Sequence, residues 1–103
     1  MELIYQKFTR ERLSPAGVLE GIDFDIPQNF NFGFDVVDAL AKKCPEKTAR
    51  LHLDRERRER RFSFAEVSAL SSRAANALAG LGIGKGDVVL LVLRRNWQFW
   101  PII

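Results

Sequence analysis

The alternation of apolar and polar residues changes along the chain, and each change predicts a different element. Residues 1–32 mix charged and apolar side chains without a clear period, and two prolines and two glycines interrupt residues 15–27. Such punctuation is typical of turns and irregular segments. We therefore expect residues 1–32 to form an N-terminal extension, a strap that leads into a domain starting at residue 33.

Phenylalanines recur at even spacing where this extension ends. In an extended segment, such residues share one edge. We interpret the rings as anchors that pin the strap onto a larger body, and a platform for an aromatic ligand is the alternative. The rings belong to Phe24, Phe30, Phe32 and Phe34.

From Phe34 to Lys43 the spacing becomes helical, with apolar residues three and four positions apart on one face. Acidic residues lie early in this segment and lysines lie late, as the helix dipole favours. Pro45 would stop the helix. The expected apolar face consists of Phe34, Val37, Leu40 and Ala41.

Strict alternation over residues 48–54 predicts a half-buried strand. A second strand over about residues 60–62 would complete a hairpin with a charged tip at 54–59. The tip lacks the glycine that short hairpin turns prefer, so the turn type stays open. The side chains expected to face inward are Ala49, Leu51 and Leu53, and those expected to face outward are Arg50, His52 and Asp54.

A helix should follow the hairpin. Ser63 and Glu66 have the spacing of a capping box, in which each side chain satisfies a free amide of the first turn. An apolar stripe then runs from Val67 to Leu81. Gly82 would end the helix as a left-handed cap, followed by the apolar Ile83.

A tight turn at residues 84–87 leads into six apolar residues, 88–93. A segment that is apolar on both faces is typical of a central strand in a parallel, helix-covered sheet. Asn96 would cap a further helix beginning at Trp97. The returning strand that this sheet requires is not encoded in these residues. We therefore expect an incomplete α/β domain: helix, β-hairpin, helix, parallel-type strand and the start of a helix.

Composition narrows the function classes. The 103 residues are 47% hydrophobic and 28% charged, which is the balance of a soluble globular protein. The net charge of +3 is well below the clustered excess of a nucleic-acid binder. One cysteine cannot form an internal disulfide, and no secretory signal or membrane-length apolar run is recognisable. We expect a cytoplasmic location, with neither a nucleic acid nor a membrane as partner.

Two motifs could indicate phosphate binding, but we favour a structural role for both. The glycines at 80, 82, 84 and 86 lie between a helix and the following strand, whereas phosphate loops precede a helix. Five arginines between residues 55 and 61 would meet phosphates, but three interleaved acids reduce their net charge. A solvated hairpin tip is the favoured interpretation. The arginines are Arg55, Arg57, Arg58, Arg60 and Arg61.

Three single residues are weighed as catalytic groups. His52 has no second histidine nearby and is interpreted as a surface residue rather than a base. Cys44 follows a helix end, where no dipole lowers its pKa, and is interpreted as a packing residue. Ser63 is explained by its expected role as a helix cap, and no Gly-x-Ser-x-Gly nucleophile elbow surrounds it. We assign no catalytic, cofactor-binding or metal-binding residue.

In combination, several motifs resemble the N-terminal part of AMP-forming acyl-CoA synthetases, in the adenylate-forming ligase family and nearest its acetyl- and medium-chain branch. The resemblance covers about residues 28–103. It rests on Asn29–Asp38, Arg61–Val67, Ser71–Leu78 and Leu81–Val89.

The resemblance implies an enzyme that joins ATP and a carboxylic acid into an acyl-adenylate and passes the acyl group to coenzyme A. ATP, magnesium and coenzyme A would be used by the whole enzyme, whose phosphate-binding loop, acyl pocket and catalytic lysine come later in such chains. Residues 33–103 would then be the beginning of the large domain. We expect an inactive scaffold segment that contacts the remainder of the enzyme and self-associates when isolated.

The alternative is a stand-alone interaction module. It would bind a protein or a nucleic acid through the aromatic strap or the arginine-rich hairpin. Salt-dependent binding to DNA or RNA would favour it, because phosphate contacts release counterions.

Overall fold

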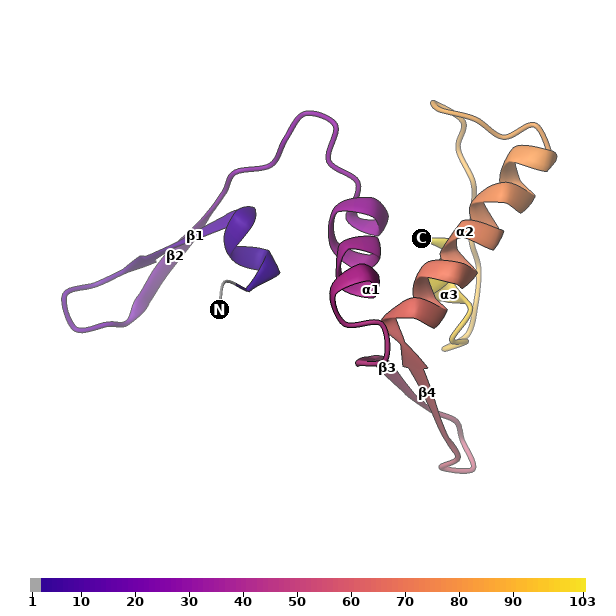
Figure 1. The fold of residues 1–103 in the computed structure, drawn as a ribbon, viewed down its shortest axis with the longest axis horizontal. Coiled ribbons are helices and arrows are strands. Elements are labelled where there is room, and N and C mark those ends of the chain that lie inside the picture. Colours follow the sequence, from indigo (N-terminus) through magenta and orange to yellow (C-terminus); the bar gives the residue numbers. More distant parts are fainter. Residues whose placement is uncertain (1–2) are drawn as a thin grey trace. The chain divides into compact units, whose positions relative to one another are not determined.

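The computed structural model describes residues 3–103. The chain divides into two compact units, Met1–Phe32 and Gly33–Ile103. Each unit combines helical turns with a two-stranded antiparallel sheet, so the protein has a small mixed α/β architecture (Figure 1). The α/β class expected from the sequence is confirmed.

The first unit is a β-hairpin preceded by the short 3-10 helix η1 (Ile4–Lys7). β1 (Thr9–Leu13) pairs antiparallel with β2 (Leu19–Phe24). The irregular pattern of residues 1–32 did not predict this hairpin. Charge explains why alternation did not reveal it: Arg10 and Arg12 contact Asp25 and Asp23 at 2.9 and 3.4 Å.

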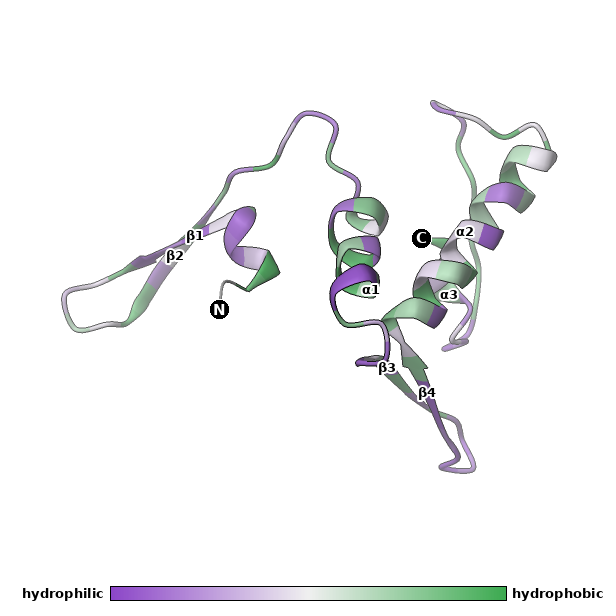
Figure 2. Ribbon diagram, viewed as in Figure 1, coloured by the Kyte–Doolittle hydropathy of each residue, from purple (hydrophilic) through white to green (hydrophobic). Residues whose placement is uncertain are grey.

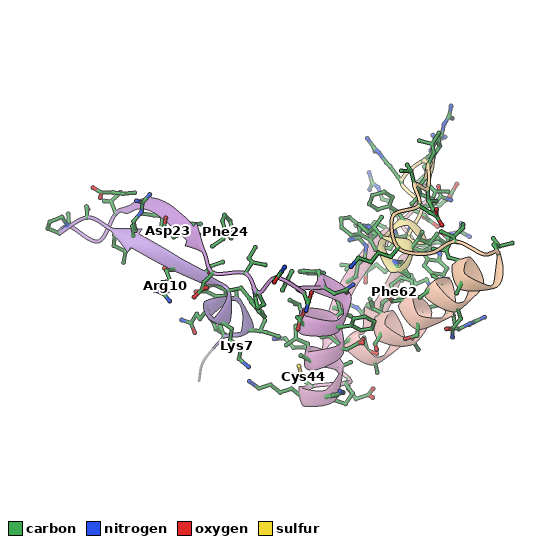
Figure 3. All side chains as sticks on the ribbon, turned by 90° about the horizontal axis from the view of Figure 1, so that it is seen from above. Lys7, Arg10, Asp23, Phe24, Cys44 and Phe62 are labelled. Carbon is green, nitrogen blue, oxygen red and sulfur yellow. The ribbon has the colours of Figure 1, made fainter. Side chains whose placement is uncertain are left out.

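The aromatic anchors of the expected strap are mostly exposed. Only Phe30 packs in a ring pair within the first unit, meeting Phe8 edge-on with ring centres 4.9 Å apart. Phe24, labelled in Figure 3, exposes more than half of its surface, and so does Phe32. Whether these rings pin the extension to a larger body stays a prediction.

The second unit begins with one helical stretch that changes its winding. Residues Gly33–Asp38 form the π-helix η2, and α1 (Ala39–Lys43) continues it as an α-helix. The helix expected over 34–43 is present, but its first half is wider than an α-helix. Wider turns rotate side chains away from the α-helical face. As a result, Phe34 is 69% exposed, whereas Leu40 of the same expected face is half-buried.

The predicted second hairpin is confirmed as β3 (Thr48–Leu53) and β4 (Glu59–Ser63), paired antiparallel. Its turn holds three residues between Asp54 and Arg58, and Arg57 adopts a φ of 63°. A turn of this length needs a left-handed third residue, usually glycine. Here Arg57, rather than a glycine, is the left-handed third residue. The turn is therefore of the three-residue type.

Ala49 is half-buried as expected, but from Arg50 to Leu53 the burial expected for β3 is reversed. The register shifts between Thr48 and Arg50, and Arg50 and His52 are half-buried. Leu51 and Leu53 are exposed. The cause is tertiary, because the C-terminal residues lie over the polar face of the strand and leave its apolar face open.

Helix α2 (Phe64–Gly80) has the predicted caps at both ends. The Ser63 N–H donates to Glu66 Oε2 at 2.8 Å, and the Glu66 N–H donates to Ser63 Oγ at 3.2 Å. At the other end Gly82 has a φ of +81°. The Ile83 N–H donates to the Leu78 carbonyl at 3.1 Å. This bond closes a Schellman motif.

The strand expected at residues 88–93 is absent from the described structure. This stretch is an open trace between α2 and the short helix α3 (Phe99–Ile102), coloured green for its apolar residues in Figure 2. Both sheets in residues 3–103 have two strands, and neither pairs with this segment. A backbone without a partner forms no ladder, whatever its β-propensity. Val88, Leu90 and Val92 are consequently 96%, 88% and 80% exposed.

The last helix also begins later than expected. Asn96 does not cap it through its side chain: the Asn96 carbonyl instead accepts the Phe99 N–H at 3.3 Å, as part of a turn. Trp97 belongs to that turn, and its ring packs against Phe62. The turn therefore delays the helix start to Phe99.

Two glycines at the end of α2 provide a matched test of this architecture. An alanine Cβ would meet open space at both Gly80 and Gly82, but only Gly82 has a positive φ. We expect Gly82→Ala to lower the free energy of unfolding by about 1 kcal/mol, because left-handed backbone is strained for alanine. Gly80→Ala should raise it by about 0.5 to 1 kcal/mol. Urea unfolding followed by circular dichroism measures both, and equal effects would contradict the Schellman assignment.

Candidate functional site

Aromatic side chains hold the C-terminal residues against the hairpin of the second unit. The ring centres of Phe62 and Trp97 lie 5.0 Å apart. Phe62 is 3% exposed and is the one buried hydrophobic side chain among the described residues (Figure 3). Helix α3 also contacts α2, so the C-terminal residues touch both neighbouring elements.

Arginines stack on these rings. The Arg60 Cζ atom lies 4.3 Å from the ring centre of Trp97 and 4.7 Å from that of Phe62. The Arg50 Cζ atom lies 3.9 Å from the ring centre of Trp100. Such cation–π contacts contribute about 0.5 to 2 kcal/mol each. Arg50 and Arg60 thus join β3 and β4 to the C-terminal segment.

Arg50 has an unusual environment for a charged residue. Its Nε atom is buried and has no hydrogen-bond partner in residues 3–103. Burial disfavours the charged form and lowers the pKa of the Arg50 guanidinium from its ordinary value. Buried polar atoms in native proteins are nearly always satisfied by protein, water or ligand. The Arg50 Nε atom is an exception to this rule among the described residues.

A hollow of about 450 Å³ opens beside Arg50, between β3 and the C-terminal segment. Apolar residues form part of its wall, and among the described residues no acidic side chain lines it. Arg95 reaches this hollow from a backbone with a φ of 41°, which is uncommon for a residue other than glycine. The polar lining consists of Arg50, His52, Arg95 and Asn96, and the aromatic lining consists of Phe99 and Trp100.

The residues weighed as catalytic groups are placed apart. His52 is half-buried and lines the hollow, which sequence reasoning did not foresee. Cys44 is a half-buried free thiol at the C-terminal end of α1. Ser63 caps α2, as expected. The structure does not gather these three residues into one site.

The interleaved charges of the hairpin tip pair with one another. Arg58 Nε lies 2.6 Å from Asp54 Oδ2, and Arg61 Nη2 lies 3.3 Å from Glu59 Oε2. Arg60 stacks on aromatic rings instead. These pairs consume part of the basic charge that a phosphate backbone would need, which favours the solvated-tip interpretation.

The glycine run does not fit a nucleotide phosphate. It follows the C-terminal end of α2, where carbonyl groups rather than amides are free. The Gly84 N–H already donates to Asp87 Oδ2 at 2.7 Å. The glycine run therefore lacks the free amides of a phosphate cradle. Within the described part of the chain, no group of three or more His, Cys, Asp or Glu residues is arranged to hold a metal ion.

None of the helices in residues 3–103 combines the length and apolarity that a membrane crossing requires.

Residues 37–103 match the family model described as AMP-binding enzyme. The chain belongs to this family. It is 37% identical over 81 residues to the human mitochondrial acyl-coenzyme A synthetase ACSM3, covering 73% of the chain and 14% of the relative. An acetyl-coenzyme A synthetase of Coprinopsis cinerea is 38% identical over 69 residues, covering 66% of the chain and 10% of the relative.

The first unit also takes part in a family alignment. Human mitochondrial ACSM4 is 29% identical over 104 residues, covering 95% of the chain and 18% of the relative. The resemblance to acyl-CoA synthetases seen in the sequence is confirmed, and the chain spans less than one fifth of the length of these relatives. It corresponds to a small N-terminal part of them.

The stacked arginines were missed because Arg50 and Arg60 occupy positions that alternation assigns to solvent. The available signal was the spacing of the two tryptophans, Trp97 and Trp100, three residues apart in a short apolar segment. That spacing places two rings on one side of a helical turn. The residues that pack against these rings, Arg50 and Arg60, are distant in sequence. Local pattern therefore cannot predict the contact.

The tip of the hairpin provides a pH test. The Arg58 backbone N–H bond is the main cause that lowers the Asp54 pKa below its ordinary value of 3.8, and the Arg58 side chain adds to it. A carboxyl with a lowered folded pKa stabilises the fold above its unfolded pKa and loses this effect as pH falls through the folded value. We expect unfolding free energy to drop on acidification through this range, and Asp54→Asn to reduce the drop.

Arg58→Gln separates the two causes, because it removes the guanidinium but keeps the backbone N–H. A carbon-detected NMR titration of the Asp54 carboxyl should show a pKa that rises only partly in this variant. A full return to the ordinary value would contradict the dominant role of the backbone bond.

Proposed function

We propose that this chain is the N-terminal structural segment of an ATP-dependent, AMP-forming acid–CoA ligase. The whole enzyme would activate a carboxylic acid as an acyl-adenylate and transfer the acyl group to coenzyme A. Family membership over residues 37–103 and the names of the acyl-coenzyme A synthetase relatives support this proposal. ATP, magnesium and coenzyme A would be bound by the remainder of the enzyme.

The exposed apolar segment 88–93 is the observation that carries the scaffold role. Val88, Leu90 and Val92 alternate with the less exposed Val89 and Leu93. This alternation is what a strand shows when one face is covered and the other awaits a neighbour.

Surface of this kind has two consequences. In the whole enzyme it would be covered by further strands and helices of the large domain, of which residues 33–103 would be the beginning. In isolation it would favour self-association, because uncovered apolar patches and strand edges promote association. The first unit, residues 1–32, would act as an extension that contacts the same large domain.

The proposed location is the cytoplasm, supported by a single unpaired cysteine, Cys44. The acyl-coenzyme A synthetase relatives named above are designated mitochondrial. Fractionation of cells that express the tagged gene product distinguishes the two compartments, and mitochondrial recovery would overturn the cytoplasmic assignment.

ATP–pyrophosphate exchange tests the scaffold role directly. The isolated 103 residues should give no exchange above the buffer level with acetate, hexanoate or octanoate, because we propose that the remainder of the enzyme binds ATP and magnesium. A chimera of human ACSM3 in which this chain replaces the matching 81 residues should retain exchange. Exchange by the isolated chain would contradict the proposal, and so would a folded but inactive chimera.

A matched pair of variants in the chimera tests the role of segment 88–93. Leu90→Asp should abolish soluble expression or activity, because it places a charge where we propose a buried strand. Arg55→Asp, at the exposed hairpin tip, should leave both unchanged. Full activity of the Leu90→Asp chimera would show that the segment stays exposed in the enzyme.

A further inference from the structure

We propose that the hollow beside Trp100 binds a flat aromatic oxyanion, held by Arg50 and Arg95. The ligand would combine a carboxylate, sulfonate or phosphate group with a planar ring. None of the family's reaction machinery is involved, so this inference is independent of the proposed ligase function.

The positive charge of the residues that line the hollow supports the binding of an oxyanion. Two guanidinium groups line the hollow, and among the described residues no carboxylate lines it. Arg50 forms none of the ion pairs seen in residues 3–103, unlike Arg58 and Arg61 of the neighbouring tip. An anion entering the hollow therefore meets positive charge that has not already been neutralised.

Hydrogen-bond geometry supports it independently. The face of the Arg50 guanidinium lies on Trp100, with Cζ 3.9 Å from the ring centre. Stacking occupies the face of a guanidinium and leaves its donor edge available. The Nε atom on that edge is buried, so the terminal Nη groups, which are not among the buried unpaired atoms, would be the donors to an incoming oxyanion. Oxyanions with two oxygen atoms match such an edge and form charge-assisted hydrogen bonds with it.

The apolar residues that line the hollow favour a ligand with a flat ring. Phe99 and Trp100 meet edge-on with ring centres 5.3 Å apart, and both line the hollow. Leu53 and Leu93 add aliphatic surface. Ligand sites are commonly mostly apolar, with a few convergent polar groups that fix orientation. A flat ring suits these walls better than a hydrated inorganic ion does.

The backbone at Arg95 adds a third observation. Its φ of 41° places a non-glycine residue in the left-handed region. Strained positions of this kind cluster at ligand sites, where they aim a side chain. Arg95 is thereby directed to the hollow that Arg50 and His52 line from β3.

Benzenesulfonate, benzenesulfonamide and inorganic sulfate provide a matched set of probes for the full 103-residue chain. The first two share the ring, but only benzenesulfonate is charged at pH 7. Binding is followed through the indole N–H resonance of Trp100 in NMR titrations. We expect saturable binding of benzenesulfonate, with the sulfonamide and sulfate at least about tenfold weaker, because charge-assisted bonds and ring contact are both required.

Variants of the protein complete the test. Arg50→Met keeps an apolar side chain over Trp100 but removes the charge, and it should weaken benzenesulfonate binding about tenfold. Arg95→Gly removes the second charge and relieves the backbone strain, so it should weaken binding without loss of stability. Arg55→Met at the hairpin tip is the control and should change nothing.

Two results would overturn the proposal. Equal affinity for benzenesulfonate and benzenesulfonamide would reduce the hollow to an apolar surface. Unchanged benzenesulfonate binding by Arg95→Gly, which we expect to fold, would remove the arginine pair from the site. Circular dichroism and thermal unfolding of each variant separate loss of binding from loss of fold. Failure of these experiments leaves the exchange assays on the chimera unaffected.

Discussion

The contact between Phe62 and Trp97, extended by the stacked Arg60, is the interaction on which the second unit depends. It joins the hairpin to residues that lie more than thirty positions later in the chain. Among the described hydrophobic residues, Phe62 is the one whose side chain is buried. Without this contact, the C-terminal segment would keep only its contacts with α2 and the stacking of Arg50 on Trp100.

This packing decides which face of β3 is covered. The rings of Trp97 and Trp100 lie over arginines and leave Leu51 and Leu53 open. Cation–π stacking makes that arrangement tolerable, because it gives a guanidinium a favourable partner as water is removed. The same choice creates the hollow beside Arg50 and leaves apolar surface for the larger domain we propose. The hollow and the exposed apolar surface thus both result from the packing of the C-terminal residues on β3.

Local pattern was sufficient wherever an element is stabilised by its own neighbours in sequence. The capping box at Ser63 and Glu66, the left-handed Gly82 and the hairpin over residues 48–63 all depend on groups a few positions apart. Pattern failed at residues 88–93, where β-propensity needs a partner strand, and in the first hairpin, where charge pairs replace alternation. The candidate site was missed for the same reason, since Arg50 and Trp100 meet only after the chain returns.

The sequence by itself determined the family, the α/β class, the second hairpin and both ends of α2. Those features rest on short-range hydrogen bonds and residue order, which a linear reading contains. Only the tertiary structure decided the burial of Arg50 and His52, the exposure of Val88 and Leu90, and the hollow between β3 and the C-terminal helix. Burial is a property of distant segments brought together, and in a small unit a single aromatic contact is enough to reverse the face that alternation favours.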